Sequence, residues 1–524
     1  MDRAGEISQA VGQLLVGRLP GTTVDAQSQA AIRGGIMGGV TLFKDNAADL
    51  DQLCALVDEL GNLLGEEGLI AVDQEGGAVQ RFDNILTPLP SAMAFGALND
   101  RNVLAALIEI SARQLRLLGV NCVLAPVLDV ASNPLNPIIA TRSFGGDPER
   151  VAQLGALTAQ TYLEGGILPV GKHFPGHGDT LEDSHSNLAV CPWQLSQLAS
   201  RELLPFERCL SQLPAILTGH IWLPSIDEKP LPASLSSGVT TDLLRQQMGF
   251  SGLVITDDLP VMKAIVDHFG LSQAALLAIL AGADLLLVSG TLDETASVHD
   301  ALCAAVQDGQ ISQERLHQSL SRRRSFLART AKFTRLNPSP TAARRKSLKE
   351  SIATSAEISF QSSVAAIAVL RGNLPNIQAH SGDWVIVVPE HPRFAIDLHC
   401  QLTRRLSCWT GSLSQKRYPL DPRKETTSEI AAFCAGKHCL FLTYRALINR
   451  GQLELGQTLS RNAKSGTLIA LDAPFELGSM LEWENAVATF DPSDQAVAAL
   501  AQLLTGSGAA RGVCPVSLPP GAQL

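Results

Sequence analysis

The sequence predicts an α/β protein in which an N-terminal (β/α)8 barrel precedes a smaller, doubly wound α/β domain. Two observations carry the barrel prediction. Eight short apolar runs alternate with longer stretches of helix-type spacing up to about residue 290, a pattern typical of parallel βα units. Seven of the presumed strands also end in polar or charged residues. Because the carboxyl ends of barrel strands converge on one mouth, a shared polar pocket explains these ends together. An open doubly wound sheet is the alternative.

The eight apolar runs have the length of strands, and the stretches between them, such as 103–118 and 271–281, have helical spacing. The runs are Leu14–Gly17, Gly39–Phe43, Leu69–Val72, Cys122–Val127, Ile167–Val170, Ala215–Thr218, Leu253–Thr256 and Leu285–Val288. The polar ends are Lys44–Asn46, Asp73–Glu75, Asp129, Lys172–His173, Gly219–His220, Asp257–Asp258 and Ser289.

Beyond the eighth run, residues 291–335 have a helical pattern in which Arg322–Arg324 is expected to form a solvated face. Asn337–Pro340 breaks this pattern. We therefore expect a barrel domain over residues 1–335, a linker over 336–356 and a second domain over 357–524. Entry of the linker into another helix is the alternative.

The second domain is expected to hold about five strands, which fits a small doubly wound fold. Its apolar runs are Val364–Leu370, Trp384–Val388, Cys439–Thr443, Thr467–Leu471 and Val487–Phe490. No Gly-x-Gly-x-x-Gly or P-loop pattern supports nucleotide binding. Glu390–His391 and Asp472 stand at its strand ends and are weaker candidates than the polar ends of the barrel.

Composition narrows the class of protein. The net charge of −10 argues against a nucleic-acid-binding surface, and no apolar run approaches membrane-spanning length. The ten cysteines form no Cys-x-x-Cys pair, so we expect neither disulfides nor a zinc framework. Because Met1–Ile7 also lacks the order of a signal peptide, we expect a cytoplasmic protein with reduced, mostly buried thiols.

The stretch Gly171–His185 gathers chemically active side chains directly after a buried strand. It contains three histidines, three carboxylates and one lysine, interrupted by glycine and proline. Such a loop can hold a polyhydroxylated ligand and transfer protons; a solvated polar loop is the alternative. Within it, Asp183 stands two residues before His185 and can accept the Nδ1–H of that ring, which would raise the pKa of the imidazole. A surface Asx turn is the alternative reading of this pair.

Asp257 is the first acid after the run Leu253–Thr256, so its side chain is expected to point into the barrel mouth, whereas Asp258 is expected to point away and cap the helix at 260–266. A strand-end carboxylate is the usual nucleophile of a retaining glycosidase. The alternative role for Asp257 is that of a capping aspartate.

These residues resemble the β-N-acetylglucosaminidases of glycoside hydrolase family 3, and the matching positions cover nearly all of residues 10–290. The matches are Val40–Phe43, Ala71–Gly77, Val79–Phe82, Arg142–Gly145, Lys172–Gly178, Asp183–His185, Thr218–Ile221, and Ile255–Leu259 with Met262. The string Lys-His-Phe-Pro-Gly-His-Gly with a downstream Asp-Ser-His is the most specific of them.

The resemblance implies a role for each matching residue. Asp257 would be the nucleophile, and His185 the general acid/base paired with Asp183. The residues that would bind the sugar hydroxyls and the N-acetyl group are Asp73, Arg81, Arg142, Lys172 and His173. His220 and Met262 would line the wall of the pocket. Structural ion pairs are the alternative for the charged members of this set. His177 is expected to shape the loop rather than to touch the sugar.

The resemblance thus implies a retaining exo-β-N-acetylglucosaminidase that acts on short glycans such as peptidoglycan fragments, or muropeptides, without a metal or organic cofactor. A phosphorylase or a β-glucosidase of the same family is the alternative, and a non-catalytic sugar-binding protein is a third reading. The second domain matches the family weakly, apart from the ending Arg511–Pro519. It is expected either to narrow the mouth of the barrel or to be purely structural.

Overall fold

Eight parallel strands close into a barrel in the first part of the computed structural model, which describes residues 3–182, 188–331, 341–380, 382–391, 396–407 and 409–519. The strands run in the order β11-β9-β7-β6-β3-β2-β1-β12, and a parallel bridge between Ile255 and Leu285 joins the two ends of this sheet. The barrel prediction is therefore confirmed and the open sheet was wrong. The bounds are β1 Leu15–Arg18, β2 Gly39–Leu42, β3 Leu69–Val72, β6 Cys122–Val123, β7 Leu168–Phe174, β9 Ala215–Thr218, β11 Leu253–Thr256 and β12 Leu286–Leu287.

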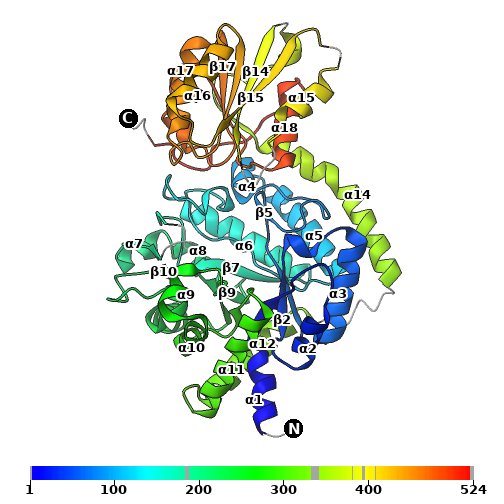
Figure 1. Cartoon of the computed structure of the whole chain (residues 1–524), viewed down its shortest axis with the longest axis vertical. Helices are drawn as coiled ribbons and strands as arrows, with labels where there is room; N and C mark the ends of the chain where they lie inside the picture. Colours follow the sequence, from blue (N-terminus) through cyan, green and yellow to red (C-terminus); the bar gives the residue numbers. More distant parts are fainter. Residues whose placement is uncertain are drawn as a thin grey trace.

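Helices surround this barrel in the lower part of Figure 1. One of them, α5 (Arg101–Leu118), illustrates how the sequence starts and ends a helix. The Asp100 side chain accepts hydrogen bonds from the first free N–H groups of the helix, and Gly119 ends it in a left-handed conformation. The other helices are α1 Arg3–Gly12, α2 Ala26–Arg33, α3 Leu50–Leu64, α4 Ala92–Leu98, α6 Pro148–Glu164, α7 Leu195–Ser200, α8 Leu204–Cys209, α9 Lys263–Phe269, α10 Leu271–Ala281, α11 Leu292–Gln307 and α12 Gln313–Ala328, with a π-helical segment at Gly238–Gln247.

The prediction that Arg322–Arg324 of α12 form a solvated face was wrong, because two of these three arginines make contacts inside the protein. Arg323 is only 2% exposed, and its guanidinium donates to the carbonyls of Gly38 and Glu67 at 3.0 and 2.6 Å. Arg322 forms an ion pair of 3.0 Å with the buried Asp284. The guanidinium groups tie α12 to buried backbone and to a buried carboxylate, a use of arginine that its polar spacing along the helix does not reveal.

A 26-residue helix, α14 (Thr341–Ala366), occupies most of the expected linker. Its Leu348 belongs to the hydrophobic core of the barrel, and its Ser355 hydrogen-bonds to Thr87 at 2.6 Å and to Gln114 of α5 at 3.1 Å. Figure 1 shows the same helix running from the side of the barrel up to the second domain, where it packs on α18 (Asp494–Leu504). Because α14 contacts both parts, the residue that divides the two domains stays a prediction.

The second domain is a six-stranded mixed sheet in the order β13-β18-β17-β16-β14-β15, in which β13 alone runs antiparallel to its neighbour. Alternate residues of β14 enter two different cores, Trp384 and Ile386 on one face and Val385 and Val387 on the other. Helices therefore cover both faces, as predicted for a doubly wound fold. The bounds are β13 Ala368–Arg371, β14 Asp383–Glu390, β15 Ser412–Pro419, β16 His438–Thr443, β17 Ser465–Ala470, β18 Asn485–Ala488, α15 Leu398–Arg405, α16 Lys424–Cys434 and α17 Gly451–Asn462.

One strand of this sheet, β15, was not predicted, and β13 begins later than predicted. β15 lies at the edge of the sheet and pairs only with β14. Most of its side chains are polar and partly exposed, so it lacks the apolar run by which the other strands were found. The run that starts at Val364 becomes a strand only at Ala368, since residues 364–366 still belong to α14.

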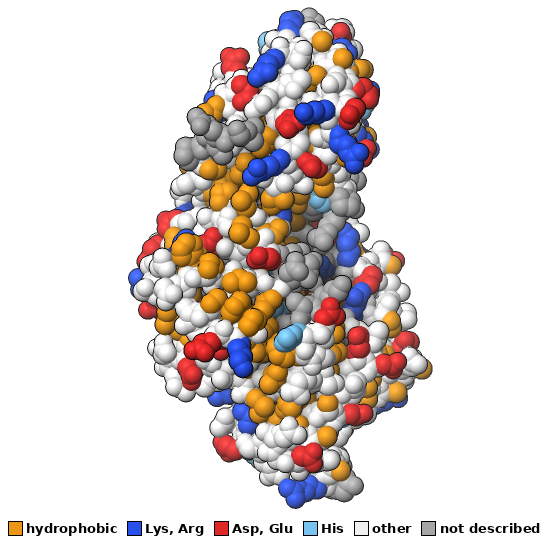
Figure 2. Space-filling view, turned by 60° about the vertical axis from the view of Figure 1, so that its left-hand side comes forward, with side chains coloured by type: hydrophobic (Ala, Val, Ile, Leu, Met, Phe, Trp, Pro, Cys, Tyr) orange, Lys and Arg blue, Asp and Glu red, His pale blue; other side chains and the backbone are white. Residues whose placement is uncertain are grey.

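The surface mixes acidic and basic side chains on the face that Figure 2 shows, where apolar side chains gather over the middle of the molecule. Within the described residues no helix is both long enough and apolar enough to cross a lipid bilayer. The nine cysteines of the described residues are all free, and six of them are buried.

Candidate active site

Lys172 stands at the centre of a buried ion network in the barrel. It lies within β7 rather than after it, and its residue is 3% exposed. The ammonium group lies 2.7 Å from Asp73 Oδ1 and 2.6 Å from Glu75 Oε1. Arg81 pairs with the other oxygen of Asp73 at 2.8 Å, and Arg142 pairs with Glu75 at 2.8 and 2.9 Å. Three cations thus surround two carboxylates.

Asp73 directly follows β3, and Glu75 lies in β4 (Gln74–Gly76), which forms a small hairpin with β5 (Val79–Gln80). This hairpin returns the chain and brings Arg81 back to Asp73. The turn requires glycine at Gly76, which has φ +110° and where a Cβ atom would lie 2.3 Å from the carbonyl oxygen of Pro90. The sequence Asp-Gln-Glu-Gly-Gly therefore encodes both the charges and the turn that pairs them.

These carboxyl groups are ionised. Burial raises the pKa of Asp73, but the ammonium of Lys172 and the guanidinium of Arg81 outweigh it and hold that pKa well below its usual value. Burial also raises the pKa of Glu75, but Arg142 and Lys172 outweigh it and bring that pKa below its usual value. Burial alone would lower the pKa of Lys172, yet the two carboxylates raise it. The network is therefore fully charged near neutral pH.

His173 is held in one orientation and one tautomer. Its Nδ1 lies 2.7 Å from Oδ2 of Asp129, a carboxylate with no exposed surface. Its Nε2 lies 3.1 Å from a guanidinium nitrogen of Arg142. Because a guanidinium can only donate, Nε2 must accept, and the ring carries its proton on Nδ1 and donates it to Asp129. Asp129 thus orients a histidine that lies against the ion network.

His177 makes contacts within the protein that fit its expected role in shaping the loop. Its N–H donates to Asp129 Oδ1 at 2.6 Å, and its Nδ1 lies 2.6 Å from Thr180 Oγ1. Burial lowers the pKa of His177 to about 4, so the ring is neutral near pH 7.

Asp257 follows β11, where its N–H donates to the carbonyl of Thr218 at 2.9 Å. Its Oδ1 accepts the N–H of Asp258 at 2.9 Å. Burial raises the pKa of Asp257, but His173, His220 and then Lys172 outweigh it and bring the pKa below its usual value. The residue nevertheless retains some exposure to solvent, so the site offers an ionised carboxylate that a ligand can reach.

Asp258 contacts Ser289, which follows β12, and does not cap the following helix as expected. Its two oxygens accept the N–H of Ser289 at 2.9 Å and the hydroxyl of the same residue. The following helix, α9, begins after Met262 and has no side-chain cap. Burial raises the pKa of Asp258 to about 6. The neighbouring acids therefore differ in chemistry, because one is readily ionised and the other is not.

The structure thus joins Asp73, Arg81, Arg142, Lys172 and His173 by direct contacts. Asp257 and His220 belong with them through their electrostatic coupling, and His220 is held by a 2.6 Å contact between its Nδ1 and Ser234 Oγ. Met262 is 1% exposed and packs in the barrel core. Asp183 and His185 lie outside the described residues.

Two residues of the site, Glu75 and Asp129, were recognised as strand-end acids but given no role. Each is the direct partner of a residue that was given one, Arg142 and His173. The signal was present, because an acid at a buried strand end needs a cation or a hydrogen-bond donor. The sequence does not reveal which donor meets which acid.

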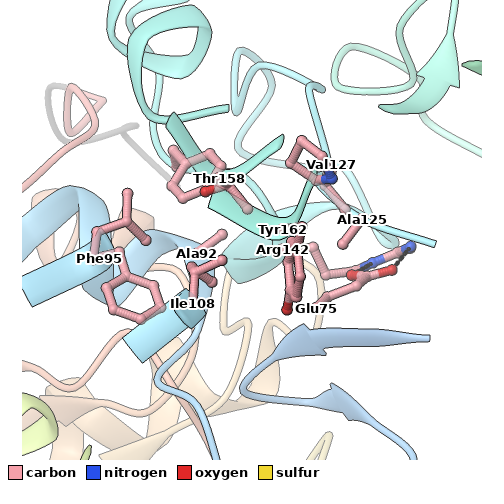
Figure 3. A pocket seen from close by; sticks show the side chains of 12 residues that line it. Glu75, Ala92, Phe95, Ile108, Ala125, Val127, Arg142, Thr158 and Tyr162 are labelled. Atoms are coloured by element: carbon pink, nitrogen blue, oxygen red, sulfur yellow. Dashed lines mark hydrogen bonds and ion pairs between the residues drawn. The ribbon is translucent and has the colours of Figure 1, made fainter. Parts of the chain in front are cut away.

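A small, mainly apolar cavity adjoins the ion network. Its lining includes Phe95, Ile108, Val127 and Tyr162 together with Glu75 and Arg142. In Figure 3 the Glu75–Arg142 pair lies at one side of this cavity, and Phe95, Ala92 and Ile108 lie at the other. This space does not match a polyhydroxylated ligand, whereas the polar groups around Lys172 do.

The site places an ionised strand-end carboxylate beside cations, imidazoles and further carboxylates at the carboxyl ends of barrel strands. Such an arrangement is typical of barrel enzymes that cleave glycosidic bonds. The family model described as "Glycosyl hydrolase family 3 N terminal domain" matches residues 6–325, more than half of the chain. The chain therefore belongs to glycosyl hydrolase family 3 and is a glycoside hydrolase.

Individual relatives agree with this assignment. A β-hexosaminidase of Bordetella parapertussis is 35% identical over 311 residues, which are 58% of this chain and 86% of the relative. A β-hexosaminidase of Methylococcus capsulatus is 39% identical over 271 residues, covering 51% of this chain and 79% of the relative. The solved structure of a family 3 β-N-acetylglucosaminidase from Paenibacillus sp. FPU-7 has a TM-score of 0.86 and 30% identity, and covers 98% of both chains.

Proposed function

We propose that the protein is a retaining exo-β-N-acetylglucosaminidase that removes terminal β-linked N-acetylglucosamine from short glycans. The observation that carries the proposal is the ionised, accessible Asp257 beside the network of Lys172, Asp73 and Arg142. The similarity to β-hexosaminidases supports the choice of sugar.

In this mechanism Asp257 attacks the anomeric carbon and forms a covalent glycosyl-enzyme while the aglycone oxygen leaves with a proton. Water then attacks the same carbon, which releases the sugar with its original configuration and frees Asp257. The proton donor would be His185, which later takes a proton from the attacking water, with Asp183 fixing its tautomer. Asp73 would accept hydrogen bonds from sugar hydroxyls, and Arg81, Arg142 and Lys172 would donate to them.

We further propose that the substrates are peptidoglycan fragments and that the enzyme acts in the cytoplasm. Phosphorolysis, in which phosphate replaces water as the attacking group, or cleavage of β-glucosides is the alternative. Turnover of p-nitrophenyl N-acetyl-β-glucosaminide and of the corresponding glucoside, each with and without phosphate, separates these activities. Absence of turnover with every combination would refute all of them.

The nucleophile is tested by Asp257→Ala and Asp257→Asn. Each should lower turnover by several orders of magnitude without changing the fold, because the covalent step is lost. Azide should restore turnover of the alanine variant and give a glycosyl azide of inverted configuration. Asp258→Asn is the matched control, because it alters the neighbouring acid, which faces Ser289. Near-normal activity of Asp257→Ala would remove this residue from the mechanism.

The proton donor is tested by comparing leaving groups. His185→Ala should impair cleavage of natural disaccharides far more than of nitrophenyl glycosides at the glycosylation step, because a nitrophenol leaves without protonation. Asp183→Ala should act in the same direction but more mildly, since it removes only the partner of the ring. Equal losses on both substrate types, or no loss on either, would assign the proton to another group.

A further inference from the structure

The second domain reaches into the barrel domain with two charged side chains. Asp472 follows β17 and Arg445 follows β16 by two residues, so both stand at the carboxyl edge of the second sheet. Asp472 is 1% exposed. Its Oδ1 accepts a hydrogen bond of 2.9 Å from the hydroxyl of Thr141 in the barrel domain, and its Oδ2 accepts from Arg445 Nε. Arg445 in turn donates through Nη1 to the carbonyl of Pro137.

This charged pair therefore binds both ends of the segment Pro137–Thr141, and the next residue of the chain is Arg142. The guanidinium of Arg142 contacts Glu75 at 2.8 and 2.9 Å and His173 Nε2 at 3.1 Å. Thr141, whose hydroxyl contacts the second domain, is thus bonded directly to Arg142, whose side chain belongs to the ion network.

The backbone at this point has an unfavourable conformation that something must stabilise. Ala140 has φ +40°, a value that residues with a Cβ atom rarely adopt and that costs on the order of 1 kcal/mol or more. Arg445 has φ +50° and lies on the other side of the same contact. Two such residues at one interface indicate that the contact, rather than local preference, fixes the backbone.

Asn136, the residue just before the segment, ties it to the barrel. Asn136 donates to the carbonyls of His177 and Thr180 at 2.8 and 2.9 Å and accepts from the N–H of Ile139 at 2.7 Å. The second domain docks close by through several further bonds, such as the 3.0 Å hydrogen bond from Gly146 N–H to the carbonyl of Pro515. Asp472 is therefore placed to hold the end of the segment that leads into Arg142, and Arg445 to hold its beginning.

We propose that Asp472 and Arg445 are positioning residues of the second domain, which hold the segment Pro137–Thr141 so that Arg142 is correctly placed for the sugar. The inference rests on the sugar-binding role proposed for Arg142. It makes the second domain a part of the active site without requiring any of its side chains to touch the substrate.

The test uses the full-length enzyme and removes one hydroxyl. Thr141→Val keeps the shape of the side chain but cannot donate to Asp472. It should raise the KM for p-nitrophenyl N-acetyl-β-glucosaminide about 5- to 20-fold and change kcat less, because it weakens binding rather than the chemical step. Thr141→Ser keeps the hydroxyl and should return KM to within about twofold of the wild type.

Thr443→Val is the matched control. It also removes a buried hydroxyl, one that donates to Glu476 at 2.9 Å inside the second domain. It should lower thermal stability about as much as Thr141→Val does and leave KM unchanged. Asp472→Asn should raise KM, and combining it with Thr141→Val should raise KM by less than the product of the two single effects, because both changes disturb one contact.

Three outcomes are informative. A raised KM in Thr141→Val, restored by serine and absent from Thr443→Val, supports the positioning role. An unchanged KM in Thr141→Val and in Asp472→Asn, with an active wild-type enzyme, would overturn it and leave the second domain structural. An inactive wild-type enzyme would overturn the proposed function instead, and with it the basis of this inference.

Discussion

Replacing Lys172 tests whether the ion network around it is a working electrostatic unit. In Lys172→Met, Asp73 and Glu75 lose the ammonium that lies 2.7 and 2.6 Å from them, while each keeps one guanidinium partner. Removing one member of a buried ion pair costs about 3–5 kcal/mol of unfolding free energy, because it leaves a buried charge uncompensated. We expect a loss of this size near neutral pH.

The matched control is Arg81→Met, because Arg81 also pairs with Asp73 but its side chain is 31% exposed. Solvent screens such a pair, so its removal should cost about 1 kcal/mol or less. Urea unfolding followed by fluorescence measures both, since Trp193 and Trp222 lie in the barrel domain. The unfolding free energy must depend on urea concentration with the same slope in all the proteins before their unfolding midpoints are compared as free energies.

The cost of Lys172→Met should depend on pH. In the wild type the lowered pKa of Asp73 stabilises the folded state above its unfolded value of about 3.9, and this stabilisation is lost as pH falls toward the folded pKa. Without the ammonium the pKa of Asp73 rises, and protonation relieves the buried charge at mildly acidic pH. The difference between the two proteins should therefore shrink from about pH 7 to about pH 4.

The reasoning would be refuted if Lys172→Met and Arg81→Met cost the same free energy at neutral pH. It would also be refuted if the cost of Lys172→Met did not change with pH. Either result would mean that water, rather than Lys172, compensates the charge of Asp73.

Two further predictions concern buried charges elsewhere in the barrel. Asp258→Asn should stabilise the protein by about 1–3 kcal/mol at about pH 8 and have little effect at about pH 4, because burial raises the pKa of Asp258 to about 6 and a raised carboxyl pKa reduces stability as pH increases through it. Calorimetry at both pH values measures this, and a difference independent of pH would contradict it. Arg323→Met should lower the unfolding free energy by about 2–4 kcal/mol, since the buried carbonyl of Gly38 and the carbonyl of Glu67 lose their charged donor. The exposed Arg324→Met should change it by about 0.5 kcal/mol or less, and urea unfolding that gave equal losses would contradict this reasoning.

The barrel could be predicted from sequence because its strands are buried on both faces and so appear as continuous apolar runs. Each of the eight runs overlaps a strand of the closed sheet. The rule that strand ends meet at one mouth then brought together Asp73, Lys172 and Asp257, which are far apart in sequence. This part of the fold depends on local composition and on the geometry of parallel sheets, and both are visible in a single sequence.

Predictions failed where a polar residue had an uncommon environment. Arg323 was expected on a solvated helix face, yet its side chain donates to the carbonyls of Gly38 and Glu67. β15 was not predicted, because an edge strand needs no apolar run. In both places the residue types are compatible with two structures, and the choice is made by neighbours that lie far away in sequence.

The contact between the two domains also depends on residues that lie far apart in sequence. Asp472 stands at a strand end, like Glu390–His391, and both are weaker candidates from sequence than the polar ends of the barrel. Its partner is Thr141, which stands 331 residues earlier and which no apolar or charge pattern distinguishes. A strand-end position shows that a side chain is available for a contact. The role of that side chain depends on which residue packs against it. That docking is set by α14 and by the return of residues 513–515 to the barrel domain, so a role for Asp472 becomes visible only when both domains are placed together.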